Sequence, residues 1–310
     1  MILVLTVTIP IFVVMFAGYF SARKGYIDKT GIKALTSFVF YFTLPLMLFH
    51  SLANAPVAQE LNYYFVLAYS LAGLTMFAFG FAVARWVFGC TWPEQAVQGL
   101  AISFGHTVFI TIPIATALYG EAANLPIALL IAIEMGVTVP VAIVLLEIQQ
   151  SQSGTMWTAI MKGANAALVS PIILSILLGI SAALLEIKMP TILDGIVSLV
   201  RGATVPCALY AIGASLAGLP LAERMRETGF MVLAKLFVYP AVVLLFMQFV
   251  PGLDPNWRNI ALIASATPVG VSVYLVASSY NAYQARASTA TLASVILAVV
   301  TLSILVVLLG

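Results

Sequence analysis

Long apolar stretches alternate with short polar ones along the whole chain. A helix that crosses a membrane needs about 20 mainly apolar residues, because each residue rises about 1.5 Å and the hydrocarbon layer is about 30 Å thick. Ten stretches meet that requirement, so the pattern predicts ten transmembrane helices. They lie at about residues 3–21, 33–52, 63–88, 96–119, 124–147, 164–185, 194–217, 228–250, 257–280 and 286–309.

The composition excludes a soluble protein. Of the 310 residues, 63% are hydrophobic and 8% are charged, whereas soluble domains carry about 25% charged residues. The formal net charge is +2 and no more than two basic residues are adjacent, so a nucleic-acid partner is not expected. We therefore expect an all-α, multi-pass integral protein of a cell membrane.

The sequence lacks the motifs of the common enzyme classes. It has no G-x-S-x-G, H-E-x-x-H, Walker or dinucleotide-binding pattern, and Cys90 and Cys207 show no metal-ligand spacing. We therefore expect no enzymatic activity, no metal and no cofactor. If the protein transports a solute, a gradient must supply the energy.

Basic residues are distributed unevenly between the predicted loops. Nine lie in or near the loops after odd-numbered predicted helices, and three lie in or near the loops after even-numbered ones. Cytoplasmic loops carry an excess of Lys and Arg, so residues 22–32 and 220–227 are predicted to be cytoplasmic and both termini external. The nine are Arg23, Lys24, Lys29, Lys33, Arg85, Lys162, Arg224, Arg226 and Arg286; the three are Lys188, Arg201 and Arg258.

The two halves of the chain show an internal repeat. An offset of 161 residues, the distance from Pro10 to Pro171, also aligns Gly18 with Gly179, Ser37 with Ser198, Pro45 with Pro206, and Tyr119 with Tyr280. This predicts a five-helix repeat at 1–148, a linker at 149–163 and a second repeat at 164–310. Because five is odd, the second repeat enters the membrane from the opposite side, and such inverted repeats place a substrate site near the midplane.

The fourth and ninth predicted helices are interrupted by Gly and Pro, which predicts broken helices that cross at this site. A proline removes one backbone donor and frees nearby backbone groups for a ligand or water. The alternative is a simple packing kink, which membrane helices also show. The candidate substrate-binding residues are Ser103, Gly105, His106, Thr107, Pro113, Ser265, Thr267, Pro268, Gly270 and Ser272.

Three of the ionisable residues inside predicted spans stand out: His106, Glu134 and Lys235. Such groups cost about 2.5–3.5 kcal/mol at a helix centre, so each is a candidate coupling group. We predict that Glu134 or His106 changes protonation during the cycle. The alternatives are a carboxylate satisfied by hydroxyl groups, a lysine that extends to the interface and a structural histidine. His50 and Arg201 are expected at the membrane interface.

Four segments carry a resemblance to a known family: IPIFVVMFAGYFSARKGYIDK, FVFYFTLPLMLFHSLANA, FGHTVFITIPIATALYGE and ATPVGVSVYLVASSYNAY. They resemble the auxin efflux carrier family, which includes bacterial malonate carriers and plant auxin exporters. The resemblance covers nearly the whole chain, and it implies ten helices in a scaffold bundle and a crossover bundle. It also implies transport of organic anions by alternating access. This chain has His106 where family members often have Asn.

These observations predict a secondary active transporter of small organic anions, namely carboxylates. The predicted partners are that anion, the lipid bilayer and a coupling proton or sodium ion. A second copy of the chain, in a homodimer, is a further candidate partner. A passive channel or uniporter would share the same spans, and a membrane sensor would bind the ligand without moving it. Saturable, concentrative uptake distinguishes the three.

Overall fold

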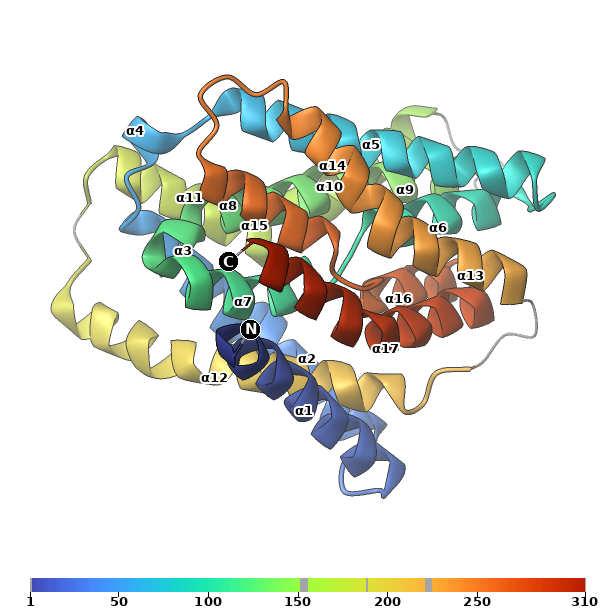
Figure 1. The fold of residues 1–310 in the computed structure, drawn as a ribbon, viewed down its shortest axis with the longest axis horizontal. Coiled ribbons are helices and arrows are strands. Elements are labelled where there is room, and N and C mark those ends of the chain that lie inside the picture. Colours follow the sequence, from blue (N-terminus) through green and yellow to red (C-terminus); the bar gives the residue numbers. More distant parts are fainter. Residues whose placement is uncertain (1, 151–155, 188, 221–224, 310) are drawn as a thin grey trace.

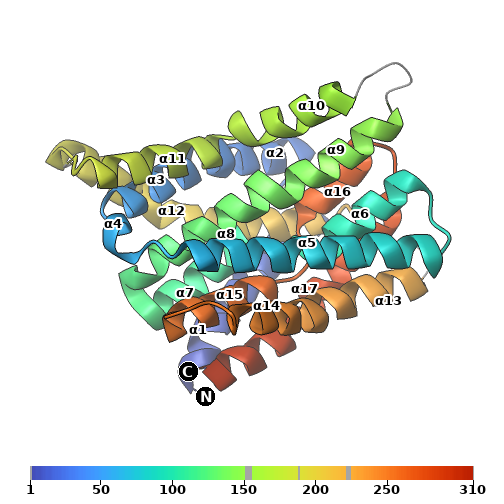
Figure 2. The ribbon, with the colours of Figure 1, turned by 90° about the horizontal axis from the view of Figure 1, so that it is seen from above.

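Helices account for nearly all of residues 2–150, 156–187, 189–220 and 225–309, the part of the chain that the computed structural model describes. These ranges contain no strand, and their single β-type contact is an isolated bridge. Most helices run along the long axis of the molecule and pack side by side (Figure 1 and Figure 2). The predicted all-α class is confirmed for this part of the chain.

The first half of the chain forms thirteen helical elements of different lengths. They are α1 (Ile2–Arg23), α2 (Lys29–Phe38), η1 (Val39–Thr43), α3 (Leu44–Ala53), α4 (Val57–Glu60), α5 (Tyr63–Trp86), α6 (Trp92–Ser103), η2 (Thr107–Thr111), α7 (Ile112–Tyr119), η3 (Gly120–Ala123), α8 (Asn124–Ile133), η4 (Glu134–Thr138) and α9 (Val139–Gln150).

The second half forms nine. They are α10 (Met156–Leu168), α11 (Pro171–Leu184), α12 (Thr191–Leu216), α13 (Met225–Leu233), η5 (Ala234–Val238), α14 (Tyr239–Met247), α15 (Pro255–Ser265), α16 (Val271–Ser279) and α17 (Gln284–Leu309).

Six helices among the described residues are long and apolar enough to cross a membrane, and a bent pair adds a seventh. One of the six, Thr107–Gln149, has 43 residues. A straight helix of that length would extend about 65 Å, about twice the hydrocarbon thickness, but the turn η3 interrupts it. The helices of a multi-pass protein are therefore present, while ten crossing helices stay a prediction.

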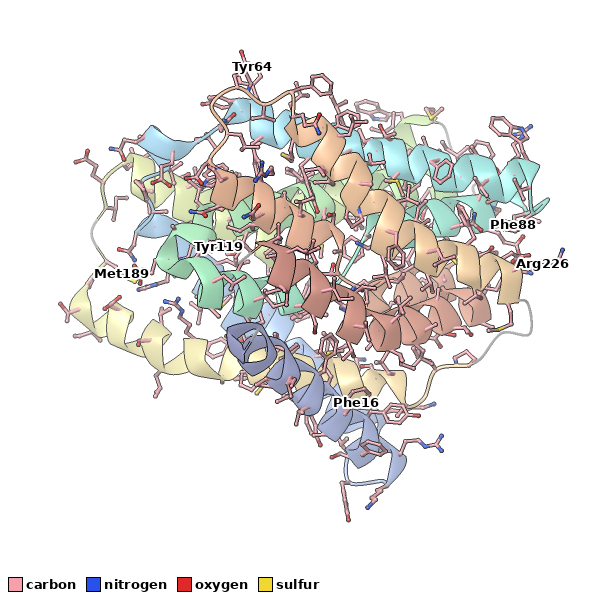
Figure 3. The ribbon with its side chains drawn as sticks, viewed as in Figure 1. Phe16, Tyr64, Phe88, Tyr119, Met189 and Arg226 are labelled. Atoms are coloured by element: carbon pink, nitrogen blue, oxygen red, sulfur yellow. The ribbon has the colours of Figure 1, made fainter. Side chains whose placement is uncertain are left out.

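The outer surface carries the large apolar side chains that a lipid environment requires. Leu199 is 83% exposed and Ile192 is 80% exposed. Figure 3 labels two further examples, Phe16 on α1 and Tyr64 on α5, which lie on the outside of the molecule. In water such a surface would be unfavourable, whereas in lipid it costs nothing.

The predicted linker at 149–163 lies only partly within the described residues. Residues 151–155 lie outside the described residues, as do Lys188 and Arg224, but the chain is already helical from Met156. The helices α10 and α11 form a pair bent by 61°, and Pro171 begins the second of them. The sequence pattern missed this bend, because a single proline at a helix start resembles an ordinary first turn.

Four π-helical turns, η1, η2, η4 and η5, each precede a helix with proline at its second position. A proline has no N–H and its ring clashes with the carbonyl four residues earlier, and a wider π turn accommodates that missing bond. Two of the turns carry the intramembrane charges, because Glu134 begins η4 and Lys235 lies in η5. The four prolines are Pro45, Pro113, Pro140 and Pro240.

Two glycine contacts relate the halves of the chain. The backbone of α1 at Gly18 lies so close to α12 that a Cβ would overlap the carbonyl oxygen of Tyr210. The backbone of α11 at Gly179 approaches α3 in the same way, where a Cβ would lie 2.9 Å from the carbonyl oxygen of Phe49. The offset that aligns Gly18 with Gly179 also aligns Phe49 with Tyr210. Each half therefore packs its first helix on the other half through equivalent residues.

Two polar contacts join loops at one end of the molecule. His50 Nε2 and Asp194 Oδ1 lie 2.5 Å apart and link the end of α3 to the start of α12. The Asn62 amide donates to the carbonyl oxygen of Pro251 at 3.5 Å. All four residues lie in or beside predicted loops that follow even-numbered helices. His50 is thus near a helix end, as expected, while Arg201 is half-buried within α12.

Candidate functional site

The two broken helices meet at their breaks. Helix α6 is separated from η2 by a short extended stretch, and α15 is separated from α16 by another. Gly105 in the first break and Val269 in the second form the isolated antiparallel bridge. The His106 amide donates to the carbonyl oxygen of Pro268 at 3.0 Å. We call this meeting point, residues 104–106 with 266–270, the crossing.

The crossing is too tight for a side chain at Gly105. A Cβ at this residue would overlap the Thr267 hydroxyl and would lie 2.8 Å from Lys235 Nζ. Glycine is therefore required here by close approach of three segments, and the lysine ammonium lies directly beside the crossing.

Lys235 points to the end of α15 and not to the membrane interface. Its side chain is fully buried, and Nζ donates to the carbonyl oxygen of Ser265 at 2.7 Å. Carbonyls in the last turn of a helix lack intrahelical partners, so the ammonium satisfies one that the break has freed. Nζ also lies 4.7 Å from the centroid of the Tyr239 ring, a cation–π contact.

Glu134 lies on the other side of this region. Its carboxylate is buried and accepts hydrogen bonds from Thr107 Oγ1 at 2.7 Å and from the Tyr69 hydroxyl at 3.1 Å. The charges of Glu134 and Lys235 interact, but no direct ion pair joins these two described side chains. The carboxylate thus connects α5, η2 and η4 beside the crossing.

The remaining predicted site residues divide into two groups. The hydroxyls of Ser103, Ser265 and Thr267 are buried, and each donates to a backbone carbonyl oxygen three or four residues earlier, at 2.7–2.9 Å. Pro113 instead lies in the first turn of α7, beyond the break, and Ser272 is exposed on α16. The structure gathers around the crossing Gly105, His106, Thr107, Ser265, Thr267, Pro268 and Gly270 with Glu134 and Lys235.

Two tyrosines of this region were missed by the sequence analysis. Tyr69 and Tyr239 are fully buried, and their ring centroids are 6.2 Å apart. Tyrosines of membrane helices are usually found at the interfaces. The available signal was therefore that both lie inside predicted spans, 63–88 and 228–250, about two turns or more from either end.

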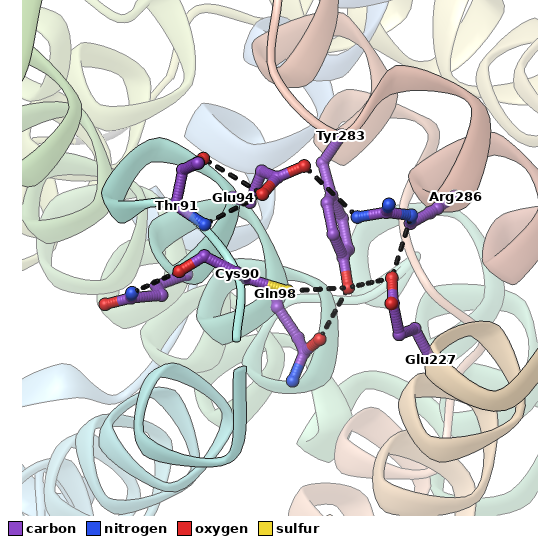
Figure 4. Close-up of polar contacts among 8 residues, drawn as sticks. Cys90, Thr91, Glu94, Gln98, Glu227, Tyr283 and Arg286 are labelled. Atoms are coloured by element: carbon purple, nitrogen blue, oxygen red, sulfur yellow. Dashed lines mark hydrogen bonds and ion pairs between the residues drawn. The ribbon is translucent and has the colours of Figure 1, made fainter. Parts of the chain in front are cut away.

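A second polar cluster was also missed, at the end of the molecule opposite His50. Arg286 Nη1 lies 3.1 Å from a Glu94 oxygen, and Nε lies 2.8 Å from a Glu227 oxygen (Figure 4). The Tyr283 hydroxyl donates to Gln98 at 2.7 Å. Burial raises the pKa of Tyr283 well above its ordinary value, so this hydroxyl keeps its proton.

This cluster ties together the starts of α6, α13 and α17, which are far apart in sequence. All of its residues lie in or beside predicted loops that follow odd-numbered helices. The Tyr280 hydroxyl, at the end of α16, donates to Glu147 near the end of α9 at 2.7 Å. Contacts between loops that follow even-numbered predicted helices therefore lie at one end of the molecule. Contacts between loops that follow odd-numbered predicted helices lie at the other end.

The crossing combines one ammonium, one carboxylate, hydroxyls and the backbone dipoles of two interrupted helices. The starts of η2 and α16 lie at the crossing, and helix N-termini favour anions. No group of three or more potential metal-ligating His, Cys, Asp or Glu side chains occurs within the described part of the chain. The ammonium, the hydroxyls and the helix starts are groups that can hold a small anion.

Comparison with known proteins places this chain in a family. Residues 3–306 match the model of a family described as "Membrane transport protein". The chain is similar to a "Putative malonate transporter" of Rhizobium meliloti (strain 1021), with 28% identity over 297 residues that cover 95% of this chain and 92% of that protein.

Two further relatives are more distant or partial. "Uncharacterized transporter YfdV" of Escherichia coli (strain K12) is 26% identical over 301 residues, which cover 92% of this chain and 90% of that protein. "Auxin efflux carrier component 2" of Arabidopsis thaliana is 28% identical over 127 residues, or 40% of this chain and 20% of that protein.

Proposed function

The chain belongs to the membrane transport protein family, that of the auxin efflux carriers, and from this premise we propose that it is a secondary active transporter of small carboxylates. Membership makes it a multi-pass integral membrane transporter and not an enzyme. The substrate class, the alternating-access mechanism and the coupling are the proposal, and the crossing of the two broken helices carries it.

A carboxylate fits the crossing on electrostatic grounds. Interrupted helices direct backbone dipoles at a ligand near the membrane midplane, where they act without competing water. The buried Lys235 ammonium adds a full positive charge beside Gly105. A relative named as a putative malonate transporter, similar over 95% of this chain, supports a small carboxylate as the substrate.

We further propose ten crossing helices in two inverted repeats, residues 1–148 and 164–310. The equivalent contacts of Gly18 with Tyr210 and of Gly179 with Phe49 support the repeat. They also favour a scaffold bundle of α1, α3, α11 and α12, which pack on one another in pairs. The crossover bundle would contain α5–α9 and α13–α17 and would move against the scaffold.

For coupling, we propose a proton on Glu134. Protonation of this carboxylate would leave the Lys235 charge without its counter-charge, so the two states of Glu134 differ in how strongly the crossing attracts an anion. Sodium coupling is the second candidate, but the Lys235 ammonium already occupies the freed Ser265 carbonyl oxygen. A tethered cation at that oxygen disfavours a sodium ion there.

The test is uptake of labelled malonate and a panel of mono- and dicarboxylates into proteoliposomes, with imposed proton or sodium gradients. We expect saturable uptake of a small carboxylate that concentrates inside when a pH gradient is applied. Uptake that never saturates would identify a channel, and binding without uptake would identify a sensor. Accumulation driven by sodium alone would overturn the assignment of Glu134.

A further inference from the structure

His106 makes two hydrogen bonds to the other broken helix. Its backbone amide donates to the Pro268 carbonyl oxygen at 3.0 Å, and its ring nitrogen Nε2 lies 3.2 Å from the Val271 amide nitrogen. A backbone amide can only donate, so Nε2 must accept and carries no proton. The ring proton then lies on Nδ1, and the imidazole is neutral.

The position of this bond explains why an acceptor is needed. Breaking a helix frees amides that nothing in a lipid environment can satisfy, so side chains must do it. The Val269 amide donates to Ser294 Oγ at 3.0 Å, and the Val271 amide, the first of α16, donates to His106. The imidazole therefore fixes the start of α16 against the start of η2.

A charged imidazole would not fit this arrangement. Both of its nitrogens would carry hydrogen, so an N–H would face the Val271 N–H and the bond would be lost. Lys235 on η5 is the charged neighbour that acts on the ring, and a second positive charge would be repelled. Glu134 accepts a hydrogen bond from Thr107, the residue after His106. The helices α15, α16 and α17 contribute backbone and hydroxyl groups to the described contacts of the crossing.

We propose that His106 is a positioning residue, a neutral acceptor that clasps the two broken helices together, and that it does not carry the coupling proton. This replaces the sequence-based expectation that His106 changes protonation. The transport part of the test rests on the proposed function, but the protonation state of the ring does not.

The first experiment measures the ring directly. The chain has two histidines, so ¹⁵N-histidine labelling of the His50→Gln variant leaves His106 as the single signal. We expect ¹⁵N chemical shifts of the neutral Nδ1–H tautomer, unchanged between about pH 5 and pH 8, the range in which a free imidazole titrates. An Nε2–H tautomer, or a change of protonation in that range, would overturn the proposal.

The second experiment separates an acceptor from a proton carrier. His106→Asn keeps an acceptor oxygen, whereas His106→Leu removes it at similar volume. We expect the Asn variant to accumulate labelled malonate under a pH gradient with the wild-type pH profile, and the Leu variant to lose at least about tenfold in both exchange and accumulation. An Asn variant that exchanges but cannot accumulate would contradict the clasp. If the wild type moves no carboxylate, the proposed function fails, and the ring measurement still decides the role of His106.

Discussion

At the scale of single residues, the crossing depends on a glycine that has no room for a methyl group. A Cβ at Gly105 would overlap Thr267 and press on Lys235 Nζ. Overpacking of this kind costs about 1–3 kcal/mol, so we expect Gly105→Ala to slow malonate uptake by about tenfold or more. Gly202→Ala is the control, because nothing lies within 4 Å of a Cβ there. Equal uptake rates for the two variants would show that the crossing has room for a methyl group at Gly105.

Glu134 gives a second residue-scale prediction. In Glu134→Gln an amide of the same shape can still accept from Thr107 and Tyr69, but it cannot release a proton. We expect malonate exchange at equilibrium to persist while accumulation under a pH gradient falls at least about tenfold, because only net movement requires the proton. Glu121→Gln, at an exposed position, is the control. Normal accumulation by Glu134→Gln would remove this residue from the coupling step.

At the scale of elements, the sequence predicted the helices and the breaks but not the contacts between them. Gly105 in one apolar stretch and Pro268 with Gly270 in the other located both breaks. A proline alone does not decide, since Pro10 and Pro206 lie inside continuous helices. A buried carboxylate was a candidate because lipid makes it costly. The direction of Lys235 was not predictable, since depth in a span does not reveal which neighbour a side chain faces. Arg286 was missed because its partners Glu94 and Glu227 are distant in sequence.

The paired glycines predict matching effects in the two halves. In an open helical position Gly→Ala stabilises by up to about 1 kcal/mol, and Gly195→Ala on α12 has such open space. We expect the opposite sign for Gly18→Ala and Gly179→Ala, each a loss of about 1–3 kcal/mol, because the added methyl groups meet the carbonyls of Tyr210 and Phe49. Thermal unfolding in detergent measures this. A loss in one variant alone would argue against equivalent packing of the repeats.

The Arg286 cluster predicts a stability effect without a direct effect on the crossing. Arg286→Gln leaves the Glu94 and Glu227 carboxylates close together without their shared cation. Side-chain exposures of 18% for Arg286 and 6% for Glu227 suggest a loss of about 1–3 kcal/mol, below that of a fully buried pair. We expect a lower midpoint of thermal unfolding, with Arg258→Gln, exposed on α15, as the control. An unchanged midpoint would mean that the cluster does not hold α6, α13 and α17 together.

At the scale of the whole molecule, the loops after odd-numbered predicted helices contact one another, and so do the loops after even-numbered ones. This separation agrees with the distribution of basic residues. The Arg286 cluster and the Tyr280–Glu147 contact join predicted loops of the odd-numbered set, to which the sequence assigns nine of the thirteen Lys and Arg. The His50–Asp194 contact lies at the opposite end. Contacts alone do not distinguish inside from outside, but the positive-inside rule does. From that rule we predict that the basic end is cytoplasmic and that both termini are external.

This orientation is testable by cysteine labelling from outside intact cells. Gly25 lies in a loop after an odd-numbered predicted helix and Gly252 in a loop after an even-numbered one. Both are exposed, and nothing lies within 4 Å of a Cβ at either, although their positive φ adds some backbone strain to any other residue. In a Cys207→Ala background, we expect a membrane-impermeant maleimide to label Gly252→Cys but not Gly25→Cys until the membrane is opened. Burial raises the pKa of the Cys90 thiol, so little of it is the reactive thiolate and background labelling stays slow. The reverse pattern, with Gly25→Cys labelled from outside, would invert the predicted topology and place both termini in the cytoplasm.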